Sequence, residues 1–346
     1  MTFSVTKSYL STVAGIAYDR KLISLDDNLK DYIWDGKFDD PHNSQITWHH
    51  LLNQSSQWSG ELFGTYDWAD RPPRGLSLEE IKKQKILSPG KAYKYNDVRV
   101  NLLSYSLLNV FRKPLPVVLK ENIMDPIDAS PTWRWFGYDN SMVIVDGINV
   151  QSVSGGGHFG GGIFINSEDH ARFGLLFLRD GIWGGERLLS SEWIEKIRVP
   201  SKNNPSYGYM WWLNRGNRKW DGLPENIYYG SGFGGNYVIV IPDNDLVIVA
   251  RWLDSSKVGE FVRKVVESGT GVAINTGVTN LPPVSGKTGT AEDWKTGLDH
   301  AWFVCFTPSD KSELLVVAFA QNTPGGGSVH ALPMAKQILK VWNEKN

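Results

Sequence analysis

Ser4 and Lys7 are the residues whose types and spacing most clearly suggest chemistry. They stand three residues apart in Ser4-Val5-Thr6-Lys7, at the start of a segment with few helix breakers. This spacing places both side chains on one face of a helix, one turn apart. The lysine can take the serine proton there, provided that burial or a neighbouring charge lowers the pKa of its amine. We interpret Ser4 as a nucleophile and Lys7 as its base.

The same S-x-x-K pattern occurs at Ser88-Pro89-Gly90-Lys91, where Pro and Gly oppose a continuous helix. By itself the pattern is weak, and we favour Ser4 because an apolar helical segment follows it directly.

Tyr95 and Asp97 form a second candidate group. A tyrosine beside a cation can exist partly as phenolate and can pass a proton to a leaving group. Asp97 stands two residues later and could contact substrate. The alternative interpretation of Tyr95-Asn96-Asp97 is a surface loop before a helix.

An acyl-transfer site also needs a strand that supplies a backbone N–H to an oxyanion hole and groups that hold the substrate. Two segments could supply them. One contains Ser231, Gly232 and Phe233 after Gly230, and the other contains Lys287, Thr288 and Gly289 before Thr290. Lys295-Thr296-Gly297 spells the same motif as the second segment, but we expect a turn there.

The hydrophobic periodicity predicts two successive blocks of three strands and a helix, after a mainly helical first part. We place the domain boundary near Lys257, which gives domains 1–256 and 257–346. The predicted helices are 3–19, 47–54 with Thr47 as cap, 97–111, 167–181 with Ser167 as cap, 257–268 and 332–343; the predicted strands are 227–232, 237–241, 246–251, 284–290, 301–306 and 314–320.

Composition excludes several classes of function. The chain has 346 residues and a formal net charge of -1, so no global field attracts nucleic acid. Cys305 is the single cysteine, so no intrachain disulfide can form. No apolar run is long enough to span a membrane, and no signal peptide is visible. His49, His50 and His158 lack ligand spacing, so we expect no metal and no cofactor. The expected partner is a small-molecule or peptidoglycan-derived substrate.

Six segments together resemble the β-lactamase-related serine hydrolases, which include class C β-lactamases, D-alanyl-D-alanine carboxypeptidases and family VIII esterases. The segments, within residues 2–254, are FSVTKS, GIAYDRKLISLDDNLKDYI, ITWHHLLNQSSQW, YKYNDVRVNLLS, SGGGHFGGGIFI and YGSGFGGNYVIVIPDNDLVIV. The resemblance implies an α/β (α+β) fold, an antiparallel sheet flanked by helices with an all-helical subdomain. It also implies that Ser4 is the nucleophile, Lys7 the base and Tyr95 the second proton carrier. Asp97 stands where the family usually has Asn.

The tail is similar to a different group. FVRKVVESGTGVA, VSGKTGTAE, HAWFVCFTP, LLVVAFAQN and PMAKQILKVW resemble the end of a penicillin-binding protein transpeptidase domain. In that family Lys287, Thr288 and Gly289 would line the active-site edge strand. The sequence thus looks like a join of two related parents.

Three departures from the family pattern shape the expectations. The N-terminal helix and two strands that precede S-x-x-K in the family are absent, Gly230 replaces a Lys or His that binds carboxylate, and the last strand block is duplicated. We expect the first block, Tyr229–Arg251, to lie beside Ser4. The second block, Val284–Asn322, would then lie outside the catalytic domain. Alternatively, it could extend the sheet at the edge that the absent strands would occupy.

The expected function is that of a serine acyl-transfer hydrolase acting through an acyl-enzyme on an ester, a β-lactam or a D-alanyl peptide. The missing cation at position 230 favours esters or neutral amides, whereas Lys287 at the edge strand would favour β-lactams. The alternative is a catalytically impaired penicillin-binding-type pseudo-enzyme, or a non-native fusion of two such proteins. The resemblance implies the bacterial periplasm or cell envelope.

Overall fold

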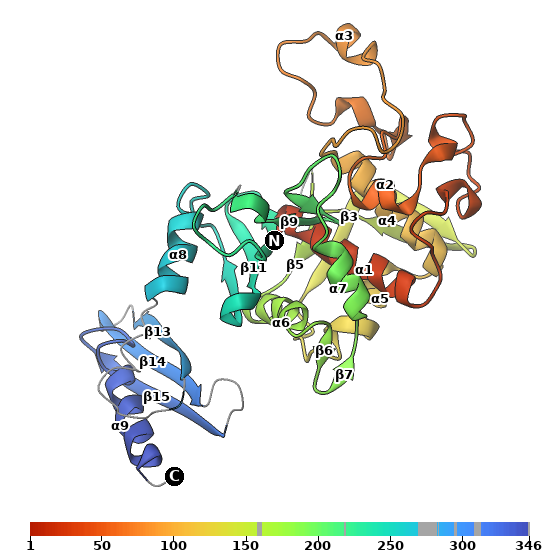
Figure 1. Ribbon diagram of the computed structural model, residues 1–346. Helices are drawn as coiled ribbons and strands as arrows, with labels where there is room; N and C mark the ends of the chain where they lie inside the picture. Colours follow the sequence, from red (N-terminus) through yellow and green to blue (C-terminus); the bar gives the residue numbers. More distant parts are fainter. Residues whose placement is uncertain are drawn as a thin grey trace. The chain divides into compact units, whose positions relative to one another are not determined.

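The protein consists of two compact units, Met1–Val258 and Gly259–Asn346, and each is described by itself (Figure 1). The structure is a computed structural model. It describes residues 1–157, 161–217, 219–268, 282, 284–293, 296–307 and 313–344.

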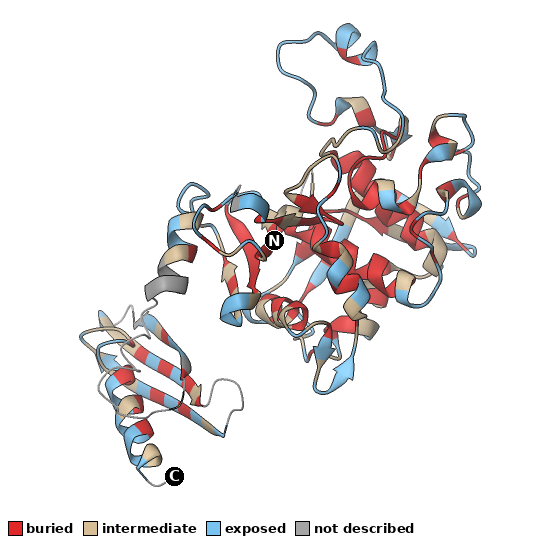
Figure 2. Ribbon diagram, viewed as in Figure 1, coloured by how far each residue is buried: buried red, intermediate tan, exposed pale blue. Residues whose placement is uncertain are grey.

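Helix α1 (Thr6–Asp19) is the buried centre of the first unit (Figure 2). A short 3-10 turn, Phe3–Val5, precedes it, so the α-helix begins at Thr6 and not at Phe3 as predicted. Small side chains let neighbours approach closely: a Cβ at Gly15 would lie 2.5 Å from the indole of Trp193. The helices that pack on α1 are α4 (Asp97–Phe111), α5 (Leu115–Leu119) and α7 (Ser191–Ile197).

The next α-helix along the chain is α2 (Trp48–Leu52), whose cap is Thr47, as predicted. Helix α4 packs against α2 and spans the predicted residues. The other short elements are β1 (Glu61–Leu62), β2 (Thr65–Tyr66), α3 (Leu78–Lys82), a π-helical turn (Lys120–Met124), β6 (Ile182–Trp183) and β7 (Glu186–Arg187).

A five-stranded antiparallel sheet completes the first unit. Helix α6 (Ser167–Leu178) and the start of α1 pack against the face that carries Val238 and Val240. Asn166 rather than Ser167 caps α6, because its side chain accepts the N–H of Asp169. The strand order is β12 (Leu246–Ala250), β11 (Asn236–Ile241), β10 (Tyr228–Gly232), β9 (Trp211–Leu213) and β8 (Tyr207–Gly208).

A three-stranded antiparallel sheet lies beside α4 and the amino-terminal turn. Its order is β4-β3-β5, where β3 is Arg134–Val145, β4 is Ile148–Val153 and β5 is Gly162–Phe164. The backbone N–H of Thr2 donates to Ile163 at 2.8 Å, and the N–H of Ile163 donates to the Thr6 hydroxyl at 3.0 Å. These bonds fix the turn that carries Ser4.

The second unit forms its own antiparallel sheet, in the order β13-β14-β15. The alternative in which this block extends the first sheet is therefore wrong, and among the described strands β12 lies at an edge of the first sheet. The physical reason is a separate core, in which α9 packs on β14 and β15 through Phe303, Cys305, Val316 and Leu339. The elements are α8 (Val258–Ser268), β13 (Ser285–Asp293), β14 (Leu298–Thr307), β15 (Leu314–Thr323) and α9 (Ala331–Asn343).

Candidate active site

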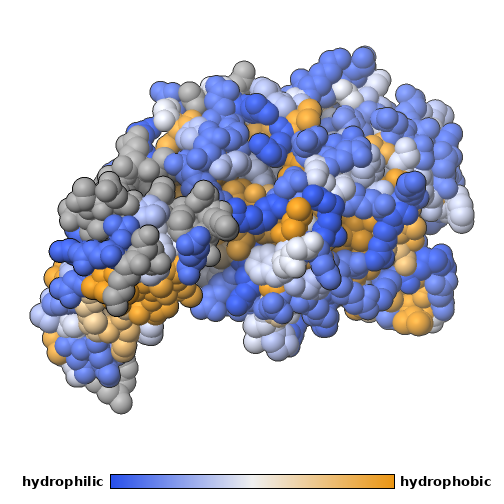
Figure 3. All heavy atoms as spheres, turned by 60° about the horizontal axis from the view of Figure 1, so that its bottom comes forward, coloured by the Kyte–Doolittle hydropathy of each residue, from blue (hydrophilic) through white to orange (hydrophobic). Residues whose placement is uncertain are grey.

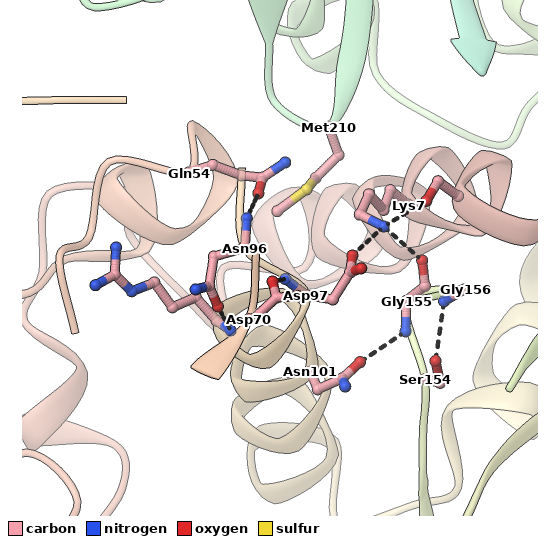
Figure 4. Close-up of polar contacts among 12 residues, drawn as sticks. Lys7, Gln54, Asp70, Asn96, Asp97, Asn101, Ser154, Gly155, Gly156 and Met210 are labelled. Atoms are coloured by element: carbon pink, nitrogen blue, oxygen red, sulfur yellow. Dashed lines mark hydrogen bonds and ion pairs between the residues drawn. The ribbon is translucent and has the colours of Figure 1, made fainter. Parts of the chain in front are cut away.

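The structure brings Ser4 and Lys7 together at the amino-terminal start of α1. The Nζ atom of Lys7 lies 2.9 Å from Ser4 Oγ and 3.1 Å from the carbonyl oxygen of Gly155. It also lies 2.6 Å from Oδ1 of Asp97 (Figure 4). Lys7 is 2% exposed, whereas Ser4 is half-buried and reachable by a substrate. The geometry suits proton transfer between the two side chains.

The protonation of Lys7 differs from the expectation. Burial alone lowers the pKa of this amine, but the charge of Asp97, together with Tyr95, outweighs burial and raises the pKa above its usual value. The condition set for a basic Lys7, a lowered pKa, is therefore not met in the resting site. The sequence pattern does not reveal this, because the effect comes from a residue far along the chain.

Asp97 joins Lys7 to a second cation. Its Oδ2 atom pairs with Arg71, and Arg71 also pairs with Asp70 at 2.9 Å. The carboxylate of Asp70 accepts the backbone N–H of Asp97. Burial raises the pKa of Asp97, but Lys7 and Arg71 together lower it below its usual range. Asp97 is therefore an anion between two cations.

Arg71 and Asp70 are site residues that the sequence analysis did not single out. They lie just before Pro72 and Pro73, in a segment that is neither helix nor strand, and no spacing rule links them to Lys7. Arg71 is 46% exposed and lies 4.8 Å from the centre of the Tyr95 ring. Loop residues of this kind are found by tertiary geometry alone.

The amino-terminal end of α4 holds Asp97 in place. Asn96 caps the helix by accepting the N–H of Arg99, and its own N–H donates to Gln54 at 2.8 Å. Gln54 in turn donates to the Tyr207 hydroxyl at 2.8 Å, which ties the helix end to β8. Capping of this kind satisfies backbone groups that a helix end leaves unpaired.

The glycine-containing segment Ser154–Gly157 lies beside Lys7. Gly155 donates its N–H to Asn101 at 2.9 Å and offers its carbonyl oxygen to Lys7. At Gly156, φ is +84° and a Cβ would lie 1.9 Å from the carbonyl oxygen of Phe3. Only glycine fits so close to the nucleophile's turn. His158 lies outside the described residues.

Tyr95 lies beside Lys7 as proposed. The Lys7 Nζ atom is 4.9 Å from the centre of its ring, and the ring stacks on Trp212 with centroids 6.0 Å apart. The aromatic ring is thus held between the cationic cluster and strand β9.

Strand β10 presents an open backbone edge next to the Phe3–Val5 turn. A Cβ at Gly232 would lie 2.1 Å from the carbonyl oxygen of Thr2, and one at Gly230 would lie 2.8 Å from Val5. In the described part of the chain β9 pairs with β10 at Tyr228 and Tyr229, so the ladder between these two strands stops before Gly230. Ser231 and Gly232 therefore lie near Ser4, and the ring of Phe233 contacts that of Phe3 at 5.5 Å.

Lys287, Thr288 and Gly289 are not in the same unit as Ser4. They lie on β13, opposite Val304, Phe303 and Trp302 of β14. Lys287 is exposed and donates to the backbone oxygen of Thr288.

A cavity of about 850 Å³ lies elsewhere, at the carboxyl end of α1, where Tyr18, Asp19 and Glu192 line it. Ser4 is at the opposite end of the same helix, so this cavity is separate from the Ser4–Lys7 cluster. No helix among the described residues is long and apolar enough to cross a bilayer.

Comparisons with known proteins identify the family of the chain. Residues 1–252 match the family model Beta-lactamase, and residues 248–340 match Penicillin binding protein transpeptidase domain. The chain belongs to the β-lactamase family, whose members are serine hydrolases. Its last part carries a segment of transpeptidase type.

Solved structures share the fold at low sequence identity. A penicillin binding protein from Bacillus halodurans is 18% identical with a TM-score of 0.53, over 76% of this chain and 84% of that chain. A family VIII carboxylesterase is 18% identical with a TM-score of 0.52, over 72% of this chain and 75% of the other. The fold is mixed α/β with antiparallel sheets, as expected.

The tail has a curated relative of its own. Peptidoglycan D,D-transpeptidase MrdA of Haemophilus influenzae is 32% identical over 118 residues, which are 30% of this chain and 18% of that protein. The chain therefore spans less than a fifth of this relative.

Proposed function

We propose that the chain is a serine hydrolase that forms an acyl-enzyme at Ser4 and acts on an ester or a neutral amide. One observation carries the proposal: Lys7 Nζ lies 2.9 Å from Ser4 Oγ, beside the open edge of β10. Nucleophile and proton carrier are thus within hydrogen-bonding distance where a substrate backbone or carbonyl can approach.

In the proposed reaction Ser4 Oγ attacks the carbonyl carbon and its proton passes to Lys7. The backbone N–H groups of Ser4 and Phe233 would stabilise the oxyanion. Tyr95 would carry the proton to the leaving group, and water would then release the acyl group. Ser231 and Gly232 would bind the substrate along the edge, whereas Asp97, which the sequence suggested as a substrate contact, is buried and would act through Lys7.

The choice of ester or neutral amide rests on position 230. A Cβ there would already meet Val5 and Ser8, so glycine leaves no side chain to bind a substrate carboxylate. The fold shared with a family VIII carboxylesterase is compatible with this choice. A β-lactam or D-alanyl peptide is the second candidate, because residues 248–340 match a transpeptidase domain and contain Lys287-Thr288-Gly289.

A labelling experiment tests the proposal. The protein is treated with a fluorophosphonate, and with a penicillin in a parallel sample, and the adduct is located by mass spectrometry. We expect a covalent adduct on Ser4 with the fluorophosphonate and none in Ser4→Ala. Equal labelling of both proteins would refute the proposal, and a penicillin adduct on Ser4 would favour the second candidate. No adduct under any condition would leave the catalytically impaired alternative.

A further inference from the structure

The environment of Lys7 is that of an ammonium ion. Three acceptors surround its Nζ atom, namely Ser4 Oγ at 2.9 Å, the Gly155 oxygen at 3.1 Å and Asp97 Oδ1 at 2.6 Å. An ammonium has three N–H donors and no acceptor, so the site matches the charged form. In this form Lys7 donates to Ser4 and cannot take the Ser4 proton.

Asp97 is what makes the charged form stable. Lys7 and Asp97 are 2% and 1% exposed, so water screens their attraction only weakly. An asparagine at position 97 could still accept a hydrogen bond, but it would bring no negative charge.

Arg71 weakens the electrostatic attraction between Asp97 and Lys7. Its guanidinium pairs with Asp97 Oδ2, on the other oxygen from the one that faces Lys7. It therefore draws part of the carboxylate's charge away from Lys7 and adds a second positive charge nearby. Asp70 keeps Arg71 in this place through a 2.9 Å pair.

We propose that Asp97 is a positioning residue that keeps Lys7 as an ammonium in the resting site, and that Arg71 weakens this hold, so that hydrolysis begins only as the solution becomes alkaline. The inference rests on the proposed serine hydrolase function. It adds a pH control of that site, set by an aspartate and an arginine.

The proton balance of the step is simple. Lys7 first releases one proton to solvent and becomes a neutral amine. As the bond between Ser4 Oγ and the carbonyl carbon forms, the Oγ proton moves to that amine. When the bond to the leaving group breaks, the proton passes to the leaving group, and Lys7 is neutral again.

Several charged or titratable groups face Lys7 from the surrounding elements. Asp97 approaches from α4, Tyr95 from the segment before α4, and Tyr138 from β3. Arg71 and Asp70 act through Asp97 from their loop. Burial raises the pKa of Tyr138, which favours its neutral phenol.

The test is the pH dependence of Ser4 acylation by a fluorophosphonate. In the unaltered protein the rate should rise through the alkaline range. Asp97→Asn should move the midpoint of that rise down by about 1–3 pH units, which is the usual effect of an opposite charge at this distance. Arg71→Gln should move it up by a smaller amount, because the full charge of Asp97 then acts on Lys7.

The midpoint should fall in Asp97→Asn and rise in Arg71→Gln. A purely structural role of the two residues would lower the rate without moving the midpoint. Asp67→Asn is the matched control, because Asp67 forms a buried ion pair with Arg99 at 2.9 Å and does not contact Lys7. We expect its midpoint to stay in place. An unchanged or raised midpoint in Asp97→Asn would overturn the proposal. The proposal would also be overturned if Tyr95→Phe were the one variant in which the acylation rate no longer increases with pH.

A measurement without activity covers the case in which Asp97→Asn folds poorly. The NMR signal of the Lys7 ε-methylene, assigned by its loss in Lys7→Arg, should titrate at higher pH in Arg71→Gln than in the unaltered protein. Titration at the same or a lower pH would overturn the proposal. If Lys7 titrates as described but Ser4 never acquires an adduct, the proposed function fails and the inference about Lys7 stands.

Discussion

Strand β11 of the first unit and strand β14 of the second are both rich in apolar residues but have different surroundings. All six residues of β11 are buried, because helices cover one face and loop and strand residues such as Trp220 and Tyr229 cover the other. In β14, buried and exposed residues alternate, with Phe303 and Cys305 under α9. Figure 2 shows this alternation as bands along the strands of the second unit.

The exposed face of the second sheet is itself apolar (Figure 3). Its large side chains are Trp302, Val304, Leu315, Val317 and Phe319, which are 38% to 65% exposed. An apolar run without alternation is the usual sign of a strand buried on both faces. An apolar run therefore predicts a strand whose two faces are both apolar. Whether other elements of the protein cover both faces depends on the rest of the fold.

The two units should differ most in what they contribute to catalysis. Ser4→Ala removes the nucleophile and should abolish turnover of a p-nitrophenyl ester above background. Lys287→Ala, in the second unit, should retain most of it. Hydrolysis is followed by release of p-nitrophenol. A loss in Lys287→Ala as large as that in Ser4→Ala would show that both units build one site.

Removal of the proton carriers should come next. Lys7→Ala should lower the turnover by on the order of 10²–10⁴-fold, as loss of a general base typically does. Tyr95→Phe should have a smaller effect, because its ring still stacks on Trp212. Circular dichroism of both variants serves as the folding control. Unaltered hydrolysis in both would make the proton-transfer assignment wrong.

The small core of the second unit offers a stability comparison within one sheet. Phe303→Ala opens a cavity under α9 and should destabilise that unit by about 3–5 kcal/mol. Phe319→Ala, on the exposed face of the same sheet, should cost much less. Chemical denaturation followed by tryptophan fluorescence measures both. Equal losses would mean that the apolar face of β15 is covered in solution.

Acid should weaken the first unit through His170. Burial among apolar groups and the nearby Arg251 lower its pKa to about 3, whereas an unfolded histidine titrates near 6.5. As the pH drops, the unfolded state therefore binds the extra proton first. The free energy of unfolding should fall by a few kcal/mol between about pH 6.5 and the folded-state pKa of about 3. His170→Phe should reduce this slope, as measured by urea unfolding at a series of pH values. His330→Phe, in the second unit, should leave it unchanged.

Much of the fold could be predicted because its signals are local. The S-x-x-K turn, the Thr47 cap and the alternation of strand residues each depend on neighbours within a few positions. Asn166 displaced Ser167 as a cap because several adjacent polar residues could serve and only the observed backbone decides among them.

The residues of the candidate site that the sequence did not indicate depend on contacts between distant segments. Arg71 meets Asp97 across 26 positions, and Asp97 meets Lys7 across 90, so no local pattern contains either pair. The direction of the Lys7 pKa follows from those contacts, because burial and charge act in opposite directions and only distances show which is larger.

The bonds that hold the amino-terminal turn have a consequence for how the protein folds. Thr2 and Thr6 are both hydrogen-bonded to Ile163, which lies 161 and 157 positions away. Such distant contacts carry a large loop-closure entropy and tend to slow folding. During synthesis Ser4 leaves the ribosome before β5 does, and its turn can be completed only after β5 has been made. We therefore expect the reactive geometry of Ser4 to be acquired late, when most of the first unit is already in place.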